Sequence, residues 1–156
     1  MTPTDSAKLD LNELKGMIGT TVPPGPWVEI QQPMIDLFAE LTGDRQWIHI
    51  DVERARRESP FGAPVVHGLF ILALIPALTG DGAPWIKGSV GINYGADRVR
   101  FISPVLAGQR VRAEQTLKSV EPYGDGGAKL TMAVVVEIEG NDRPACSVEM
   151  IGLSCP

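Results

Sequence analysis

The stretch HGLFILALIPALTG, residues 67–80, decides the fold, because it is apolar on every side when it is wound as a helix. Gly80 closes it, and glycine is typical of helix C-termini. A helix that is hydrophobic all round belongs in the interior of a protein. Pro76 costs this helix one hydrogen bond and is expected to bend or end its last turn. The stretch therefore predicts a central helix that another layer of the fold must cover.

Strand-like segments follow that helix. Two short pieces, residues 90–95 and 98–105, precede three longer runs that are rich in valine, isoleucine and threonine and partly alternate in polarity. The longer runs are residues 109–121, 128–139 and 144–154. The separators PYGDGG and GNDR carry residues that tight turns require, which predicts an antiparallel meander. The sheet and the helix would each leave a large apolar face in water, so the predicted fold class is α+β, an antiparallel sheet wrapped around the helix.

Composition excludes several classes of protein. A chain of 156 residues suits one domain, expected over residues 11–156 after a loose N-terminus at residues 1–10. The net charge is -5 and no block of lysine or arginine is present, so nucleic acid is not an expected partner. The longest apolar run, residues 69–78, is about half of what a membrane-spanning helix needs, so no membrane is expected. Two cysteines without metal-type spacing indicate a reducing, cytoplasmic setting.

A second helix is predicted upstream, over residues 32–43. Its apolar residues recur at helical spacing, Pro33 suits the first turn, and Gly43 suits a left-handed stop. Residues 51–58 are polar and indicate a short exposed helix. Asp44 therefore lies just beyond the end of a helix, in the stretch TGDRQWIHID.

Asp44 and His49 form the candidate chemical pair. Five helical residues rotate by about 500°, so the two residues could not share one face of a continuous helix, whereas a turn after Gly43 could aim both at one point. A carboxylate and an imidazole that converge on one water can exchange protons with it, as the hydration of a double bond requires. The alternative is a turn aspartate and a half-buried strand histidine. A metal site with Asp51 and His67 is conceivable, but the spacing matches no recurrent motif, so no metal is predicted.

Three stretches of the chain resemble a known family. FAELTGDRQWIHIDVERA, residues 38–55, resembles the hydratase signature of the MaoC-like, (R)-specific enoyl-CoA hydratases. Residues 59–78, with a His-Gly pair opening the central helix, and residues 92–113 resemble the segments that follow it. The resemblance runs from about Trp27 to the C-terminus and implies the hotdog fold, a homodimer and no cofactor. It also implies a trans-2-enoyl thioester of coenzyme A or of acyl carrier protein as substrate, to which water adds syn to give an (R)-3-hydroxyacyl thioester.

The resemblance assigns roles to individual residues. Asp44 and His49 would be the catalytic pair, with His49 as base towards water and Asp44 handling the proton at the α-carbon, although a single shared water leaves the assignment ambiguous. Gly68 would supply a backbone N–H to the thioester oxygen, as a helix start can. The alternative for Gly68 is a tight turn into the helix. His67 is expected to be a structural histidine that bonds to nearby backbone.

One departure concerns the polar end of the site. Some members carry serines along the central helix, where this chain has LALIP at residues 72–76. Asn93 and Tyr94 are candidates for the missing polar support and for substrate binding, or they are ordinary strand residues. Cations for the phosphates of coenzyme A are sought among Arg45, Lys87, Arg98 and Arg100.

Two other functions stay open at this point. Hotdog proteins also host thioester hydrolysis, because a fold does not fix a function. A non-catalytic acyl-thioester binding protein is the third possibility, given the missing serines.

Overall fold

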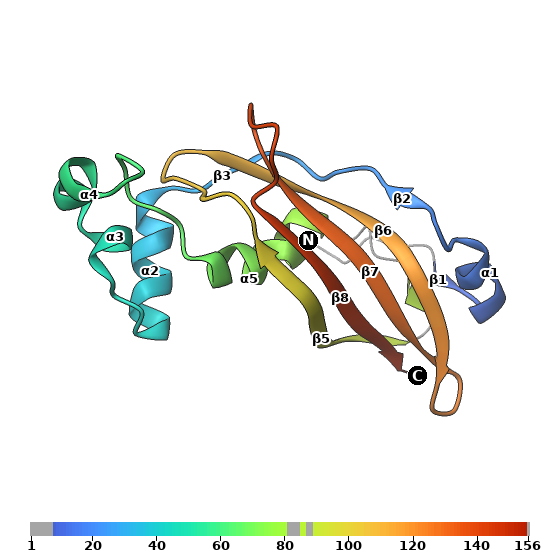
Figure 1. Cartoon of the computed structure of the whole chain (residues 1–156). Helices are drawn as coiled ribbons and strands as arrows, with labels where there is room; N and C mark the ends of the chain where they lie inside the picture. Colours follow the sequence, from blue (N-terminus) through green and yellow to red (C-terminus); the bar gives the residue numbers. More distant parts are fainter. Residues whose placement is uncertain (1–7, 81–84, 87–88, 156) are drawn as a thin grey trace.

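The computed structural model describes residues 8–80, 85–86 and 89–155 (Figure 1). Its helices are α1 (Leu11–Gly16), α2 (Gln32–Thr42), α3 (Trp47–Ile50), α4 (Val52–Glu58) and α5 (Gly68–Thr79). Its strands are β1 (Lys8–Leu9), β2 (Thr21–Val22), β3 (Val28–Glu29), β4 (Trp85–Ile86), β5 (Val90–Phe101), β6 (Arg110–Tyr123), β7 (Gly127–Ile138) and β8 (Cys146–Cys155). The predicted helices at 32–43, 51–58 and 67–80 are confirmed to within a residue or two.

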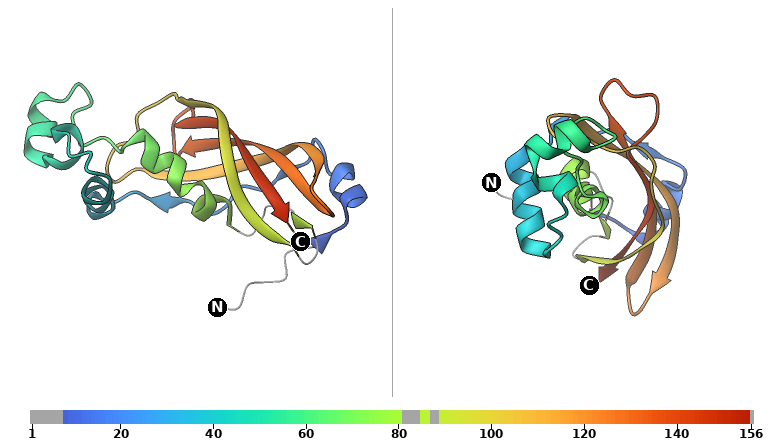
Figure 2. Two further views of the ribbon diagram at one scale, coloured as in Figure 1. Left: turned by 90° about the horizontal axis from the view of Figure 1, so that it is seen from below. Right: turned by 60° about the vertical axis from the view of Figure 1, so that its left-hand side comes forward.

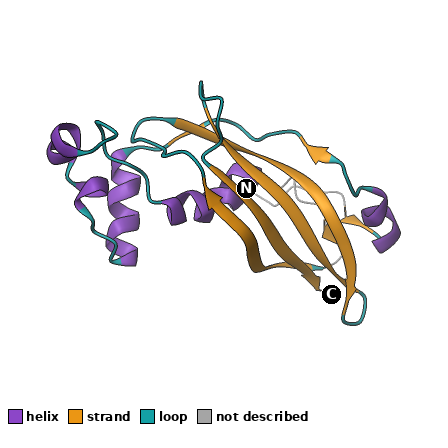
Figure 3. Cartoon of the chain, viewed as in Figure 1, coloured by secondary structure: helices purple, strands orange, loops and turns teal. Residues whose placement is uncertain are grey.

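The main sheet has the strand order β2-β6-β7-β8-β5, and β3 also pairs with β6 (Figure 3). The predicted meander is confirmed for β6, β7 and β8, which are joined by turns whose glycines, among them Gly124 and Gly126, have positive φ. The order is different for β5, which lies beside β8 rather than β6. The outer edge of β6 is taken by β2 and β3, two strands too short for a sequence pattern to reveal.

The two strand pieces predicted at 90–95 and 98–105 are one strand, β5, which ends at Phe101. Its pairing with β8 shifts register between Asn93 and Gly95 and again between Asp97 and Arg100. Arg98 lies in the second irregularity with φ 53°, an uncommon conformation for a residue with a side chain. The second irregularity lies at the boundary between the two predicted pieces.

Helix α5 packs on the concave face of the sheet, which curves around it (Figure 2). Four of its side chains are buried in the core: Phe70, Ile71, Ile75 and Leu78. They meet the inward residues of the alternating strands, such as Val111 and Leu117 of β6. The helix continues through Pro76 to Thr79, so the proline does not end it. One side of α5 is left uncovered by the described residues, and Leu69 on it is 63% exposed.

Helices α2, α3 and α4 form a separate group beyond one end of the sheet, next to the N-terminal end of α5 (Figure 1). Of the predicted loose N-terminus, residues 1–7 lie outside the described part, and Asp10 caps α1 with its side chain. No helix within the described residues is long and apolar enough to cross a membrane.

Candidate active site

The chain reverses direction where α2 ends. Gly43 adopts the left-handed conformation, with φ 79°, and its N–H donates to Ala39 O, which closes the helix. The sequence prediction of a stop at this glycine is therefore confirmed. Asp44 follows in an open segment, and the chain then enters α3, a single turn that carries His49. His49 is thus a helical residue that is only 7% exposed, and not the half-buried strand residue of the alternative reading.

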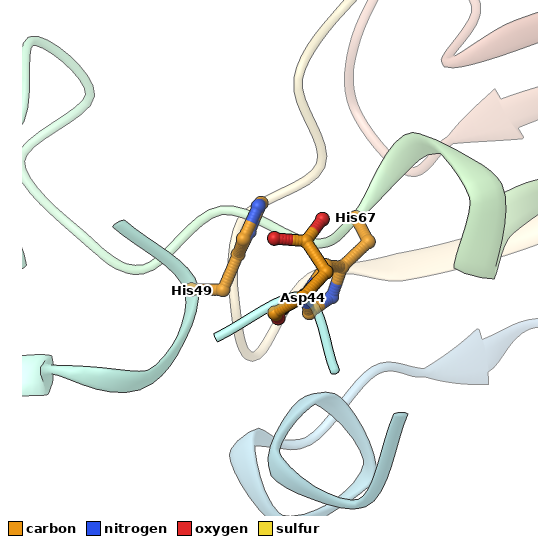
Figure 4. Close-up of side chains that lie close together, drawn as sticks. All are labelled: Asp44, His49 and His67. Carbon is orange, nitrogen blue, oxygen red and sulfur yellow. The ribbon is translucent and has the colours of Figure 1, made fainter. Parts of the chain in front are cut away.

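The reversal brings Asp44 and His49 together and adds His67 to them. A carboxylate oxygen of Asp44 and one nitrogen of each imidazole all lie within 4.8 Å of one another (Figure 4). Asp44 is exposed, whereas both rings are buried. The predicted convergence of the pair is therefore present in the structure. The catalytic roles of the two residues remain predictions.

Hydrogen bonding fixes the tautomer of His49. Its Nδ1 lies 2.5 Å from the carbonyl oxygen of Val65, and a carbonyl can only accept, so Nδ1 carries the proton. Nε2 of the neutral ring is then left with a lone pair. Burial is the largest influence on the pKa of His49 and lowers it below its ordinary value, and the proximity of His67 lowers it further. The hydrogen bond to Val65 and the carboxylate of Asp44 act in the opposite direction and raise it. A neutral imidazole with a free Nε2 is a group that can take a proton from water.

Two main-chain contacts hold the segment that carries His49. Gln32 Nε2 donates to the carbonyl oxygen of His49 at 2.8 Å, from the start of α2. Val65 N–H donates to Ile48 O at 3.0 Å, which ties α3 to the strand-like segment before α5. Sequence reasoning missed both anchors. Val65 acts through its backbone N–H here, which no side chain pattern reveals, and the contact of Gln32 joins residues 17 positions apart.

His67 bonds to nearby backbone, as predicted for a structural histidine. Its Nε2–H donates to Asp44 O at 2.9 Å, so it holds the main chain of the residue whose carboxylate faces His49. Its ring stacks on that of His49, with centroids 3.7 Å apart and planes inclined by 24°. His67 is therefore part of the site, although the sequence analysis connected it with Asp44 only through a conceivable metal site.

The geometry of the cluster disfavours a metal ion. A ligating imidazole points an in-plane lone pair at the metal from about 2.1 Å. The two rings stack with planes inclined by only 24°, so an ion about 2.1 Å from a nitrogen of one ring would lie out of the plane of the other. Asp51, the fourth residue considered, accepts from Arg54 N–H at 3.0 Å and caps α4.

Gly68 begins α5, directly after His67. A Cβ at this position would lie 2.7 Å from the ring of Phe101, so close packing requires the glycine here. Its N–H is one of the free donors of a helix start, and it has no acceptor within residues 8–80, 85–86 and 89–155. The position thus offers an unoccupied donor one residue after His67, whose ring stacks on that of His49. Its role towards a substrate stays a prediction.

Asn93 and Tyr94 are not brought to this cluster within one chain. They lie near the start of β5, and Phe101, which contacts the site at Gly68, is eight residues further along, about 25 Å of extended strand. Tyr94 is 60% exposed.

The candidate cations for coenzyme A give no cluster either. Arg98 forms an ion pair with Glu149 at 3.4 Å. Arg100 donates to the carbonyl oxygen of Val99, and Arg45 is exposed. Lys87 lies outside the described residues.

Comparison with known proteins places the chain in a family. Residues 13–139 match the model of the MaoC like domain. The chain is 44% identical over 140 residues to 3-hydroxyacyl-thioester dehydratase Z of Mycobacterium tuberculosis, which covers 89% of this chain and 91% of that protein. It is 41% identical over 145 residues to nodulation protein N of Rhizobium leguminosarum, covering 92% and 90% of the two chains.

Solved structures share the fold. An (R)-hydratase from A. caviae superposes with a TM-score of 0.70 at 24% identity, covering 86% of this chain and 94% of that one. At this level of identity the likeness concerns the fold alone, and it confirms the predicted hotdog architecture. The chain therefore belongs to the MaoC like domain family, and it is a hydro-lyase of the dehydratase and hydratase type.

Proposed function

We propose that this hydro-lyase adds water to trans-2-enoyl thioesters of coenzyme A and gives (R)-3-hydroxyacyl thioesters, with dehydration as the reverse reaction. One observation carries the proposal. The Asp44 carboxylate lies beside a neutral imidazole whose Nδ1–H is committed to Val65 O, so that the Nε2 of His49 is free to accept a proton. The relative named 3-hydroxyacyl-thioester dehydratase Z supports a thioester substrate.

The geometry supports a proton relay. Water binds between Asp44 and His49, its oxygen bonds to C3 of the enoyl group, and Nε2 of His49 takes its proton. The electron pair of the double bond moves through C2 onto the thioester oxygen, where the free N–H of Gly68 and the positive end of α5 stabilise the negative charge. His49 passes the proton to Asp44, which delivers it to C2. Both groups act from one side of the substrate, so water adds syn, and the enzyme returns to its starting protonation state.

The experiment is a turnover assay with crotonyl-CoA, followed by loss of the enoyl absorbance. Wild-type protein is expected to consume the substrate, and Asp44→Asn and His49→Gln are expected to abolish turnover while their circular dichroism stays unchanged. Asp125→Asn is a matched control, because it removes an exposed carboxylate from the β6–β7 turn. Wild-type turnover in both site variants would refute the assigned roles. Release of free thiol would indicate thioester hydrolysis, and tight binding without turnover would indicate a binding protein.

Chirality of the product tests the stereochemical part of the proposal. Hydration of crotonyl-CoA should give the (R)-3-hydroxybutyryl thioester, measured by coupling to an (R)-specific dehydrogenase or by chiral chromatography. The (S) product would leave the hydro-lyase activity in place and overturn the (R) assignment.

We further propose that two copies of the chain pair along β5. This strand is the edge of the sheet, and hydrophobic side chains such as Val90, Ile92 and Tyr94 are exposed along it. An open, apolar edge strand is a surface that proteins normally cover. Antiparallel pairing of two β5 strands would carry Asn93 of each copy towards the Phe101 end of the other. Light scattering at micromolar concentration should give a dimer, and Ile92→Lys should give a monomer. A wild-type monomer would contradict the proposal.

A further inference from the structure

The two histidines of the chain are its only imidazoles, and they are in contact. His67 is 3% exposed, lies against the ring of His49 and is packed by Phe38 with ring centroids 5.1 Å apart. Phe38 stacks in turn on Phe70 of the central helix. His67 therefore connects the candidate site to the apolar core. A side chain needed only to fill this space would not have to carry two polar nitrogens.

The hydrogen bonds assign opposite tautomers to the two rings. His49 donates from Nδ1 to Val65 O, and His67 donates from Nε2 to Asp44 O. The other nitrogen of His67, Nδ1, is buried and has no hydrogen-bond partner in the described part of the chain. Protonation of Nδ1 would bury an N–H without an acceptor beside two aromatic rings, which is costly. His67 therefore makes its hydrogen bond through Nε2 alone.

Asp44 depends on this contact for its position. Its side chain is exposed, and the other hydrogen bond of its main chain, from its N–H to Thr42 Oγ1, is long at 3.4 Å. The bond from His67 to Asp44 O, at 2.9 Å, is the shorter of the two. The His67 ring also covers one face of His49, which limits the rotation of that imidazole. Both members of the proposed catalytic pair are therefore fixed by one side chain, 23 residues from Asp44 in the sequence.

We propose that His67 is a positioning residue of the hydro-lyase reaction: it fixes Asp44 through the hydrogen bond from its Nε2–H and fixes His49 through the ring stack. The proposal rests on the proposed function, since it concerns the pair assigned to proton transfer. The titratable groups that face His67 are the carboxylate of Asp44, from the segment after α2, and His49 from α3. Helix α2 contributes the uncharged Phe38.

The first test needs no variant activity. Nitrogen NMR of protein labelled only in histidine contains two imidazoles, and His67→Phe assigns them by removing one set of signals. Above pH 7, His49 should show a protonated Nδ1 and His67 a protonated Nε2, each as a single tautomer. A His67 that carries its proton on Nδ1, or that averages between tautomers, would overturn the proposal. Absence of turnover in the wild-type protein would remove the proposed function and leave this result unaffected.

A pair of variants separates the two contacts in the activity. His67→Phe keeps a ring against His49 and loses the donor to Asp44, whereas His67→Gln keeps a donor and loses the ring. Each is expected to lower kcat for crotonyl-CoA about tenfold with KM within about twofold, because misplacement of reacting groups costs rate rather than binding.

A merely structural His67 predicts a different outcome. Both variants would then melt at lower temperature, while the folded enzyme would keep the wild-type kcat and KM. That result would overturn the proposal. If a variant does not fold, the tautomers of the wild-type protein decide.

Discussion

The sheet with α5 and the helical group α2–α4 are stabilised in different ways. The core between α5 and the strands consists of many interchangeable apolar contacts, among them those of Leu117, Val134 and Ile138. The helical group reaches the core through Ile35 of α2, but the candidate site that it carries is held by single polar contacts between segments: Gln32 to His49 O, His49 to Val65 O, and His67 to Asp44 O. A change in the first region should therefore cost stability, and a change in the second should cost activity.

The largest effect is expected at His49. His49→Gln removes the group that takes the proton, and general acid–base catalysis contributes about 10²- to 10⁴-fold, so kcat should fall by about three orders of magnitude. The free energy of unfolding of this variant should change far less than the loss of kcat, when that loss is also expressed as a free energy. The check is turnover and chemical denaturation on the same samples. An inactive variant that has also lost most of its stability would break the comparison.

The converse effect is expected in the core at Leu117, which is 1% exposed on β6. Leu117→Ala should lower the free energy of unfolding by about 2–5 kcal/mol, because buried apolar atoms are lost and a cavity is left behind. The kcat of the folded fraction should be unchanged. Urea denaturation and turnover measure the two quantities.

Leu41→Ala is the matched control, because Leu41 is 82% exposed on α2. Its stability should stay within about 0.5 kcal/mol of wild type. A larger loss that depends on protein concentration would mean that a second copy of the chain covers this face.

Much of the core region could be predicted from the sequence, because its determinants are local. The apolar run of α5 and the alternating runs of β6, β7 and β8 each carry their own periodicity. The place of β5 beside β8 could not be predicted, since pairing across a sheet depends on which edges are free. Helix α1 had a readable signal, the capping box of Asp10 and Glu13, which was not used.

The candidate site divides in the same way. The turn after α2 could be predicted from Gly43. Asp44 and His49 could converge only if the chain turned at that point. The partners of the pair had no local signature. Val65 contributes a carbonyl oxygen, and His67 meets Asp44 only after α3 and α4 have been placed. Asn93 and Tyr94 are polar and were therefore candidates for substrate binding, but the length of β5 separates them from this cluster within one chain.

An intermediate effect is expected where the two regions meet, at Gly68 and Phe101. Gly68→Ala places a methyl group 2.7 Å from the Phe101 ring, so the ring must shift, and the same methyl group crowds the N–H assigned to the thioester oxygen. The melting temperature should fall by a few degrees and kcat/KM by about tenfold or more. Gly68→Ala with Phe101→Leu should recover the melting temperature and stay slow. Full recovery of activity in the double variant would mean that the glycine serves packing alone.

The smallest effect is a shift on the pH axis, and it reports on the burial of His49. Burial lowers the pKa of this histidine in the folded protein below its ordinary value of 6.5. The neutral, proton-accepting form therefore persists when the pH falls below 6.5. The acid limb of kcat/KM should therefore lie below pH 6.5. The same shift makes the unfolded chain bind more protons, so the contribution of His49 to stability is complete above pH 6.5 and is lost as the pH falls through its lowered value. Denaturation between pH 5 and 7.5, compared with His49→Gln, isolates this contribution. Two results would contradict this: an acid limb above pH 6.5, or a stability that rises as the pH falls from 7.5 to 5 in the wild-type protein but not in His49→Gln. Either would show that the Asp44 carboxylate and the bond to Val65 outweigh burial and hold the ring in its charged form.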